Sequence, residues 1–232
     1  MKAAILTDTT KCIGCHECVI ACKKANGQDR DLPRRWNLED GLSARNWTSI
    51  VEGPERTFVR KQCRHCLNPA CVASCPSGSI YKREEDGIVL VDYDKCIGCK
   101  YCSWACPYGA RELDEQQRVM KKCTLCVDRI YDTALPEIDR KPACVMACPT
   151  SARIFGDIHD PHSDASRAIR ENGGYALMPE WGTQPANHYL PRRTTRMRIH
   201  DDELVRADNP LRVEGHLPKP APGAATLDDA SW

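Results

Sequence analysis

The sequence predicts an α+β fold in which short strands, tight loops and short helices are arranged around cysteines. Three observations predict it. All 16 cysteines of the 232-residue chain fall into four blocks of four. Short segments between the blocks favour strand, with Asp86-Gly87 as a favoured turn. Aromatic residues make up only 6% of the chain, so an ordinary apolar core would be thin.

Each cysteine block has a spacing that suits a metal-sulfur cluster. The first and third blocks have the Cys-x2-Cys-x2-Cys-x3-Cys spacing of bacterial ferredoxins. In that motif the fourth cysteine ligates the neighbouring cluster, so clusters occur in reciprocal pairs. The spacing therefore predicts four 4Fe-4S clusters as cofactors and a chain that transfers electrons. The blocks are Cys12, Cys15, Cys18 and Cys22; Cys63, Cys66, Cys71 and Cys75; Cys96, Cys99, Cys102 and Cys106; and Cys123, Cys126, Cys144 and Cys148.

These blocks refine the predicted fold to a duplicated bacterial ferredoxin-like arrangement, in which two 4Fe-4S ferredoxin-type units carry long loops and an extended C-terminal tail. The tail is expected to be mostly irregular because glycines and prolines interrupt it. The expected segments are 1–62, the first block plus an insertion; 63–117, a central two-cluster ferredoxin-like unit; 118–158, the fourth block, packing with the first; and 159–232, an extended tail that wraps a partner.

Local patterns place secondary structure between the cysteines. Alternating or β-branched residues predict two strand pairs, and the spacing of the fourth block leaves room for a helix and a surface loop. The expected strands are 79–83 with 88–93, 49–51 with 57–59, 110–112 and 152–155, and the expected helices are 127–133 and 163–171, with a loop over 135–142.

Two other uses of cysteine fit the pattern less well. The pairs Cys63-x2-Cys66 and Cys123-x2-Cys126 would each, taken alone, suit structural zinc equally well. A zinc site does not, however, need the third and fourth cysteines of each block. A disulfide scaffold is disfavoured because no apolar signal core stands near the start of the sequence.

Composition excludes several function classes. A net charge of +1 gives no global bias toward nucleic acid. No run of even ten apolar residues occurs, so no direct membrane span is expected. Beside the clusters there is no spare cysteine and no nucleotide-binding glycine motif, so we expect no catalysis by this chain alone. Metal-thiolate bonds are expected to supply much of the folding free energy.

The order and spacing of the four blocks resemble the four-cluster electron-transfer subunit of membrane-associated molybdopterin oxidoreductases of the dimethyl sulfoxide reductase family. The resemblance covers residues 1 to about 160 and is carried by the stretches 95–102 and 147–150, and by Lys23 after Cys22. The segment 177–193 is similar to members that handle sulfur oxyanions.

The resemblance implies which cysteines share a cluster. The fourth block would pair with the first, and the third with the second. Because Cys99 is present where some relatives hold a 3Fe-4S cluster, all four are expected to be 4Fe-4S. We name the implied sets thiol group 1 (Cys12, Cys15, Cys18, Cys148), thiol group 2 (Cys22, Cys123, Cys126, Cys144), thiol group 3 (Cys63, Cys66, Cys71, Cys106) and thiol group 4 (Cys75, Cys96, Cys99, Cys102).

The resemblance also implies partners. Groups 1 and 2 would face a molybdopterin catalytic subunit, and groups 3 and 4 an integral membrane quinone-binding subunit. Sulfite is the expected substrate, with tetrathionate, polysulfide, thiosulfate, dimethyl sulfoxide and arsenic oxyanions as alternatives. A free polyferredoxin is a further alternative. We expect a cytoplasmic location, peripheral on the inner membrane through a partner, with periplasmic co-export as the alternative.

Several cations flank the cysteines and could raise cluster potentials by stabilising an added electron. Solvated surface cations are an equally good interpretation for any one of them. The candidates are Lys11, Arg64, Lys95, Lys100 and Lys122.

Overall fold

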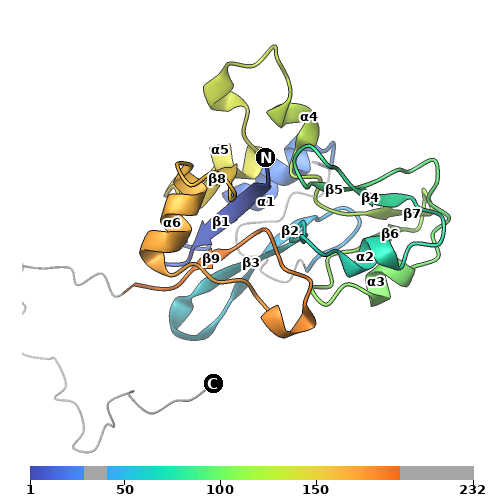
Figure 1. The fold of residues 1–232 in the computed structure, drawn as a ribbon, viewed down its shortest axis with the longest axis horizontal. Coiled ribbons are helices and arrows are strands. Elements are labelled where there is room, and N and C mark those ends of the chain that lie inside the picture. Colours follow the sequence, from blue (N-terminus) through green and yellow to red (C-terminus); the bar gives the residue numbers. More distant parts are fainter. Residues whose placement is uncertain (29–40, 194–232) are drawn as a thin grey trace, which may run out of the picture. The chain divides into compact units, whose positions relative to one another are not determined.

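The computed structural model describes residues 1–28 and 41–193, which form a mixture of short strands and short helices (Figure 1). Within these residues the strands form one three-stranded sheet, in the order β8-β1-β9, and three antiparallel hairpins. The strands are β1 (Ala3–Asp8), β2 (Thr48–Glu52), β3 (Phe58–Gln62), β4 (Ile80–Lys82), β5 (Val89–Val91), β6 (Glu112–Asp114), β7 (Val119–Lys121), β8 (Arg153–Asp157) and β9 (Tyr189–Leu190).

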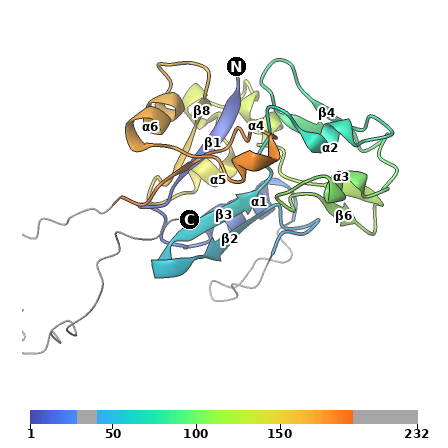
Figure 2. The ribbon, with the colours of Figure 1, turned by 60° about the horizontal axis from the view of Figure 1, so that its bottom comes forward.

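Most of the helices are single turns that carry or adjoin cysteines. Helix α1 packs beside α5, and α2 packs beside α3 (Figure 2). The first and fourth cysteine blocks are therefore joined through one helix pair, and the second and third blocks through another. The helices are α1 (Glu17–Ala25), α2 (Ala70–Ala73), α3 (Tyr101–Trp104), α4 (Val127–Ile130), α5 (Ala143–Met146) and α6 (Asp164–Asn172), with 3-10 turns at Pro54–Arg56, Glu137–Asp139 and Pro179–Trp181.

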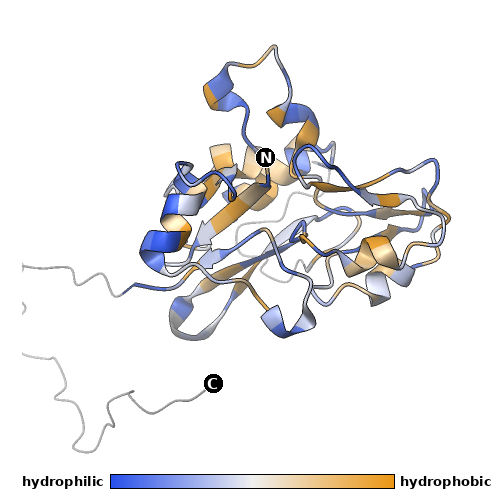
Figure 3. Cartoon of the chain, viewed as in Figure 1, coloured by the Kyte–Doolittle hydropathy of each residue, from blue (hydrophilic) through white to orange (hydrophobic). Residues whose placement is uncertain are grey.

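The three-stranded sheet joins the start of the chain to its later part. All six residues of β1 are buried, and Figure 3 colours much of this strand as hydrophobic. Helix α6 packs on the three-stranded sheet, and most of its remaining surface is hydrophilic (Figure 3). Its N-terminus is capped by Ser163, whose Oγ accepts a hydrogen bond from the Ser166 N–H at 3.0 Å. The buried apolar contacts between these elements include Leu6, Ala165 and Leu190.

Cysteines make up part of every other buried cluster in the described residues. Cys18 and Cys144 lie with Ile5 and Leu125, while Cys71 and Cys102 lie in another cluster, between β4 and β7. A third cluster contains Cys22, Cys63, Cys123, Trp47 and Ala110. The buried clusters are small and combine thiols with apolar side chains, in line with the thin apolar core expected from the composition.

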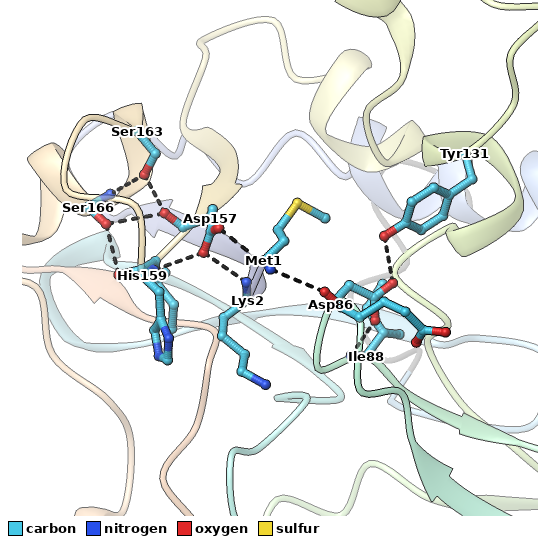
Figure 4. A network of polar contacts seen from close by, with 11 residues as sticks. Met1, Lys2, Asp86, Ile88, Tyr131, Asp157, His159, Ser163 and Ser166 are labelled. Atoms are coloured by element: carbon cyan, nitrogen blue, oxygen red, sulfur yellow. Dashed lines mark hydrogen bonds and ion pairs between the residues drawn. The ribbon is translucent and has the colours of Figure 1, made fainter.

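A polar network fixes the start of β1 against neighbouring loops (Figure 4). The Met1 amino group donates to the Glu85 carbonyl at 3.1 Å and lies 4.0 Å from an oxygen of Asp157. The other Asp157 oxygen accepts the Lys2 N–H at 2.8 Å. These contacts tie the three-stranded sheet to the turn between β4 and β5.

Asp86 is the buried acid of that turn, and its replacement by alanine is expected to destabilise the protein. Its side chain is fully buried and accepts hydrogen bonds from the Ile88 N–H, the Tyr131 hydroxyl and Arg83 at 2.9, 2.9 and 3.0 Å. Losing three acceptor contacts in a buried turn is expected to lower the free energy of unfolding by about 2–4 kcal/mol. Denaturant unfolding of the anaerobic protein measures this loss.

The matched control for Asp86→Ala is Glu85→Ala. The Glu85 side chain is 70% exposed and lies 3.8 Å from Arg83, so its loss is expected to change stability by less than about 0.5 kcal/mol. Equal effects of the two substitutions would show that the buried contacts of Asp86 add nothing to stability.

The predicted strand pairs are confirmed. β4 and β5 lie within 79–83 and 88–93, and β2 and β3 form the second pair. β3 runs on to Gln62, because Arg60 and Gln62 are buried rather than exposed. The strand expected at 152–155 is β8.

Other boundaries differ from the predictions. The strand expected at 110–112 is wrong by two residues, because Ala110 and Arg111 are buried against thiols and the strand begins at Glu112. The helix expected at 127–133 ends at Ile130 as α4. The expected loop contains the 3-10 turn at Glu137–Asp139.

The segment predicted as an extended tail, 159–232, is in part packed on the chain itself. The helix predicted at 163–171 is α6 at 164–172, one residue later at each end, and β9 adds to the three-stranded sheet beside β1. Asn187 links the Ile5 N–H to the Cys63 carbonyl with hydrogen bonds of 2.7 and 2.8 Å, which holds this segment in place. Residues 194–232 of the predicted tail lie outside the described residues. Nowhere in 1–28 or 41–193 is a helix long and apolar enough to cross a bilayer.

Candidate metal centres

The Cys-x2-Cys loop of every block turns through a residue with positive φ. This conformation points backbone donors at sulfur: the His65 N–H donates to Cys63 Sγ at 3.5 Å, and the Leu125 N–H donates to Cys123 Sγ at 3.4 Å. Such donors stabilise a thiolate. The four blocks therefore share one local loop design. The residues that precede the second cysteine are Gly14 (φ 69°), His65 (47°), Gly98 (68°) and Leu125 (57°).

Alanine at Gly98 is expected to disturb the third loop. A Cβ there would lie 2.7 Å from the Arg118 carbonyl oxygen, at a φ of +68° that side chains rarely adopt. Strain and backbone overlap together are expected to lower the free energy of unfolding by about 2–4 kcal/mol. The control, Gly78→Ala, has a similar φ of +62° but an open position, so only about 1 kcal/mol should be lost. Denaturant unfolding with equal losses in both variants would contradict this account of the loop.

Thiol groups 2 and 3 each surround a small cavity. All four thiols of group 2 line one cavity, together with Arg60. All four thiols of group 3 line another, together with Arg111. In both cases the last cysteine of one block, Cys22 or Cys106, lies with three cysteines of a different block. The structure thus brings together the two complete sets that the resemblance implies.

The thiols of these two groups also interact electrostatically. Burial raises the pKa of the Cys22 thiol, and the nearby Cys123 and Cys144 raise it further. Burial raises the pKa of Cys66 to about 12, with Cys63 adding to the effect. Cys22 and Cys66 therefore resist ionisation by themselves, whereas at Cys63 the charge of Arg111 and its neighbours outweighs burial and holds the pKa well below its usual range. A thiol that coordinates a metal is deprotonated.

Three members of thiol group 1 lie together. Burial raises the pKa of Cys12, the positive charge of Arg153 opposes this, and the neighbouring thiols of Cys18 and Cys148 raise it again. Cys15 is half-buried in the same loop. Cys148 therefore lies with the first block, although 125 residues separate it from Cys22, the last cysteine of that block.

Thiol group 4 contains one buried and three half-buried thiols. Burial raises the pKa of Cys102 to about 11, and the thiols of Cys75 and Cys96 are among those that raise it. Burial is also the largest influence on Cys75, but hydrogen bonds outweigh it and hold the pKa at about 7, led by the Ser79 hydroxyl at 3.2 Å. Cys99 is half-buried in the loop of the third block.

Three buried arginines point into thiol groups 1, 2 and 3. Each arginine is at most 4% exposed, so its guanidinium group is almost completely shielded from water. Burial of a cation requires an anionic partner nearby. The contacts are Arg153 Nη2 to Cys18 Sγ at 3.5 Å, Arg60 Nη2 to Cys144 Sγ at 3.0 Å, Arg111 Nη1 to Cys63 Sγ at 3.2 Å and Arg111 Nη2 to Cys71 Sγ at 2.9 Å.

Each of these guanidinium groups keeps one buried nitrogen that has no hydrogen-bond partner within the described part of the chain. These nitrogens are Arg153 Nε, Arg60 Nη1 and Arg111 Nε. An unsatisfied buried donor costs about 1–3 kcal/mol, and more when charged. Donors aimed at clustered thiols fit a bound anionic group with sulfur acceptors, as a 4Fe-4S cluster provides.

The thiols of groups 2 and 3 line cavities and do not converge on the position of a single metal ion. Within residues 1–28 and 41–193, no three His, Cys, Asp or Glu side chains are grouped closely enough to hold a single metal ion. Purely thiol donor sets suit iron-sulfur clusters as well as zinc. The cavities of groups 2 and 3 and the arginine donors beside them are the features that fit a cluster.

Sequence reasoning missed the three arginines, although a signal for two of them is present. The stretches Cys-Pro-x-x-Ala-Arg occur at 106–111 and 148–153, so Arg111 and Arg153 each follow the last cysteine of a block by five residues. The same position after Cys75 holds Ile80. Arg60 precedes Cys63 by three residues on β3, and only its burial in the fold reveals it.

The five cations predicted to flank clusters have different surroundings. Lys11, Lys95 and Lys100 are exposed, and the last two form ion pairs with Asp92 and Glu115. Arg64 is buried, but its guanidinium lies over the rings of Tyr108 and Tyr189, with centroids 5.7 and 4.9 Å away. Lys122 alone among these five is buried between two thiol groups.

Comparison with known proteins agrees with the class that the loops and thiol groups define. Residues 55–158 match the family model of a 4Fe-4S dicluster domain. Together with relatives at least 34% identical over 94% or more of the sequence, this match shows that the chain belongs to the family of iron-sulfur subunits that carry 4Fe-4S clusters and transfer electrons.

Particular relatives narrow the resemblance. The sequence is 56% identical to one subunit of the sulfite dehydrogenase of Allochromatium vinosum, over its whole length and 99% of that protein. It is 37% identical to one subunit of the tetrathionate reductase of Salmonella typhimurium, over 82% of this sequence and 72% of the relative. It is also 37% identical to one chain of the anaerobic dimethyl sulfoxide reductase of Escherichia coli, over 66% of this sequence and 72% of the relative. All three relatives are named as parts of larger enzymes.

Proposed function

We propose that this chain carries four 4Fe-4S clusters and relays electrons between a molybdopterin catalytic subunit and a membrane quinone-binding subunit, in the oxidation of sulfite. The observation that carries the proposal is the pair of cavities lined by complete thiol groups, with a buried arginine at each. Bound 4Fe-4S clusters supply one-electron transfer, at potentials that their surroundings set.

The proposed ligands are the four thiol groups as defined above. Support comes from Cys22, Cys106 and Cys148, because each is the last cysteine of its own block and lies with cysteines of a different block. The shared turn geometry of the four Cys-x2-Cys loops supports a duplicated ferredoxin-type origin for the two halves. The helix pairs α1-α5 and α2-α3 would then correspond to the two cluster pairs.

The protein's own residues bind, neutralise and space the sites. Arg60, Arg111 and Arg153 place positive charge at three groups and donate to thiolates, which favours an added electron. Group 4 receives hydroxyl donors, Ser77 and Ser79, in place of an arginine donor. The tuning of group 4 is therefore expected to depend on neutral dipoles at Cys75 and on the charge of Arg111 at Cys102.

Neighbouring groups form a series. Arg60 interacts with Cys144 of group 2 and with Cys18 of group 1. Cys123 of group 2 is an electrostatic neighbour of Cys63 in group 3. Groups 3 and 4 are neighbours as well. Burial is the main cause that raises the pKa of Cys102 in group 4, and the nearby thiol of Cys71 in group 3 raises it further, while Arg111 opposes both. Electron tunnelling falls steeply with distance, so contacts of this kind support an order of transfer from group 1 to group 4 or the reverse.

Sulfite is proposed because the relative that matches the whole chain, at 56% identity, is a sulfite dehydrogenase subunit. The lower identities to the tetrathionate and dimethyl sulfoxide reductase subunits make those substrates the alternatives. A cytoplasmic location, peripheral on the inner membrane through the quinone-binding partner, is part of the same proposal.

Sulfite-driven reduction of the native complex tests the proposal. The chain would be purified anaerobically with the proteins that bind it, oxidised, mixed with sulfite, and followed by electron paramagnetic resonance. We expect iron-sulfur signals without another reductant, and reduction of an added quinone. If the chain purified as a monomer and its iron-sulfur signals did not change on addition of sulfite, the proposed complex would be wrong. If tetrathionate oxidised the reduced chain within the complex, tetrathionate would replace sulfite as the proposed substrate.

A further inference from the structure

Lys122 occupies the boundary between the two helix-paired halves. It follows β7 and directly precedes Cys123, and its side chain is 3% exposed. Its Nζ donates to the carbonyl oxygen of Cys123 at 2.8 Å and to the carbonyl oxygen of Val89 on β5. A lysine this deeply buried requires compensating negative charge nearby.

The second anchor of Lys122 leads directly to thiol group 3. The Val89 N–H donates to Nδ1 of the buried His65 at 3.1 Å, and the His65 N–H donates to Cys63 Sγ. One side of the ammonium is therefore fixed to Cys123 of group 2. The other side is fixed, through one strand residue and one histidine, to the loop that holds Cys63 of group 3.

The charges around Lys122 come from both groups. Its electrostatic neighbours include Cys63, Cys71 and Cys123, and the cation Arg111. Unlike the three buried arginines, which donate to sulfur, Lys122 donates to carbonyl oxygens. Lys122 therefore acts on groups 2 and 3 through its charge and without a hydrogen bond to the sulfur of either group.

We propose that Lys122 assists electron transfer between groups 2 and 3, because its positive charge lies close to the thiols of both groups. This inference rests on the proposed function. A site with four thiolates is negatively charged in both oxidation states, so two neighbouring sites repel an added electron. A cation between them stabilises the electron on either side. In this step one site loses one electron, the other gains it, and no bond or proton is exchanged.

The test is an anaerobic redox titration of the whole, iron-loaded protein, followed by electron paramagnetic resonance. In Lys122→Met, two of the iron-sulfur components are expected to become about tenfold harder to reduce, equivalent to about 59 mV for a one-electron couple. Lys61→Met, at an exposed position on β3, is the control and should leave every component unchanged.

Two further variants separate charge from hydrogen bonding. Lys122→Gln keeps a donor for the carbonyl oxygens and removes the charge, so it should show the same two shifts even if Lys122→Met loads poorly. Lys122→Arg keeps the charge and should restore at least part of both potentials. Unchanged potentials in the glutamine variant, or a shift in one component only, would overturn the proposal. Failure of the proposed function would differ, because the unaltered protein would then lack reducible iron-sulfur components.

Discussion

Serine in place of Cys22 is expected to disrupt the cluster of thiol group 2 while leaving group 1 loaded. Cys22 belongs to the first cysteine block by sequence, but its thiol lines a cavity with Cys123, Cys126 and Cys144. Loss of one of four ligands is expected to remove that cluster or convert it to a 3Fe-4S form. Iron analysis should show a loss of up to about four irons per chain, and electron paramagnetic resonance should show one component missing or altered.

The matched variant is Cys15→Ser, in the same block. Cys15 lies in the loop with Cys12, so its loss is expected to affect a different component from the one that Cys22→Ser affects. The double variant should then lose two components. If both single substitutions altered the same component, the first block would bind one cluster by itself, and the crossed ligand sets would be wrong.

Removal of iron is expected to unfold most of the described chain. Buried clusters of residues in this fold contain thiols where larger apolar side chains would otherwise pack. Without metal, Cys22 and Cys123 favour the neutral form, because burial raises the pKa of both, that of Cys123 to about 12. Arg60 would then face neutral thiols while fully buried, a situation that costs about 3–5 kcal/mol.

That cost at one buried arginine is already a large share of the whole stability of an ordinary domain, about 5–15 kcal/mol. Circular dichroism during anaerobic chelation should therefore show loss of secondary structure in step with loss of iron. Hydrogen exchange provides an internal comparison, since α6 and the three-stranded sheet share a buried cluster that contains no cysteine. Those amides should be the last to lose protection. A chelated protein with its full native secondary structure would contradict the structural role of the clusters.

The fold was predictable where a short-range pattern determines it. The turn at Asp86-Gly87 and the alternation around it identify β4 and β5, and the serine before 164–172 marks the start of α6. The position of β9 was not predictable. Two strand residues among prolines carry almost no periodic signal, and the contact that holds them depends on Asn187, which reaches both β1 and the second cysteine block.

In the candidate site, too, the sequence predicts the features that depend on short-range spacing and not those that depend on long-range contacts. Cysteine spacing identified every thiol that lines the two cavities, because loops around a cluster require fixed separations. It did not identify the three buried arginines, and it named Lys122 only as one of five cations that flank cysteines. Arg60 looks like an exposed strand residue in sequence, and Lys122 looks like the neighbouring Lys121, which is only partly buried. Which lysine turns inward is decided by the pairing of β7 and by the carbonyl oxygens of Val89 and Cys123. That these thiols bind four clusters stays a prediction.

Iron and acid-labile sulfide content of anaerobically purified protein tests the central claim most directly. Four 4Fe-4S clusters predict about sixteen irons and about sixteen sulfides per chain, with four reducible components in electron paramagnetic resonance. A value near eight irons would mean that only one pair of thiol groups binds clusters. Zinc in place of iron, or iron without labile sulfide, would contradict the account altogether.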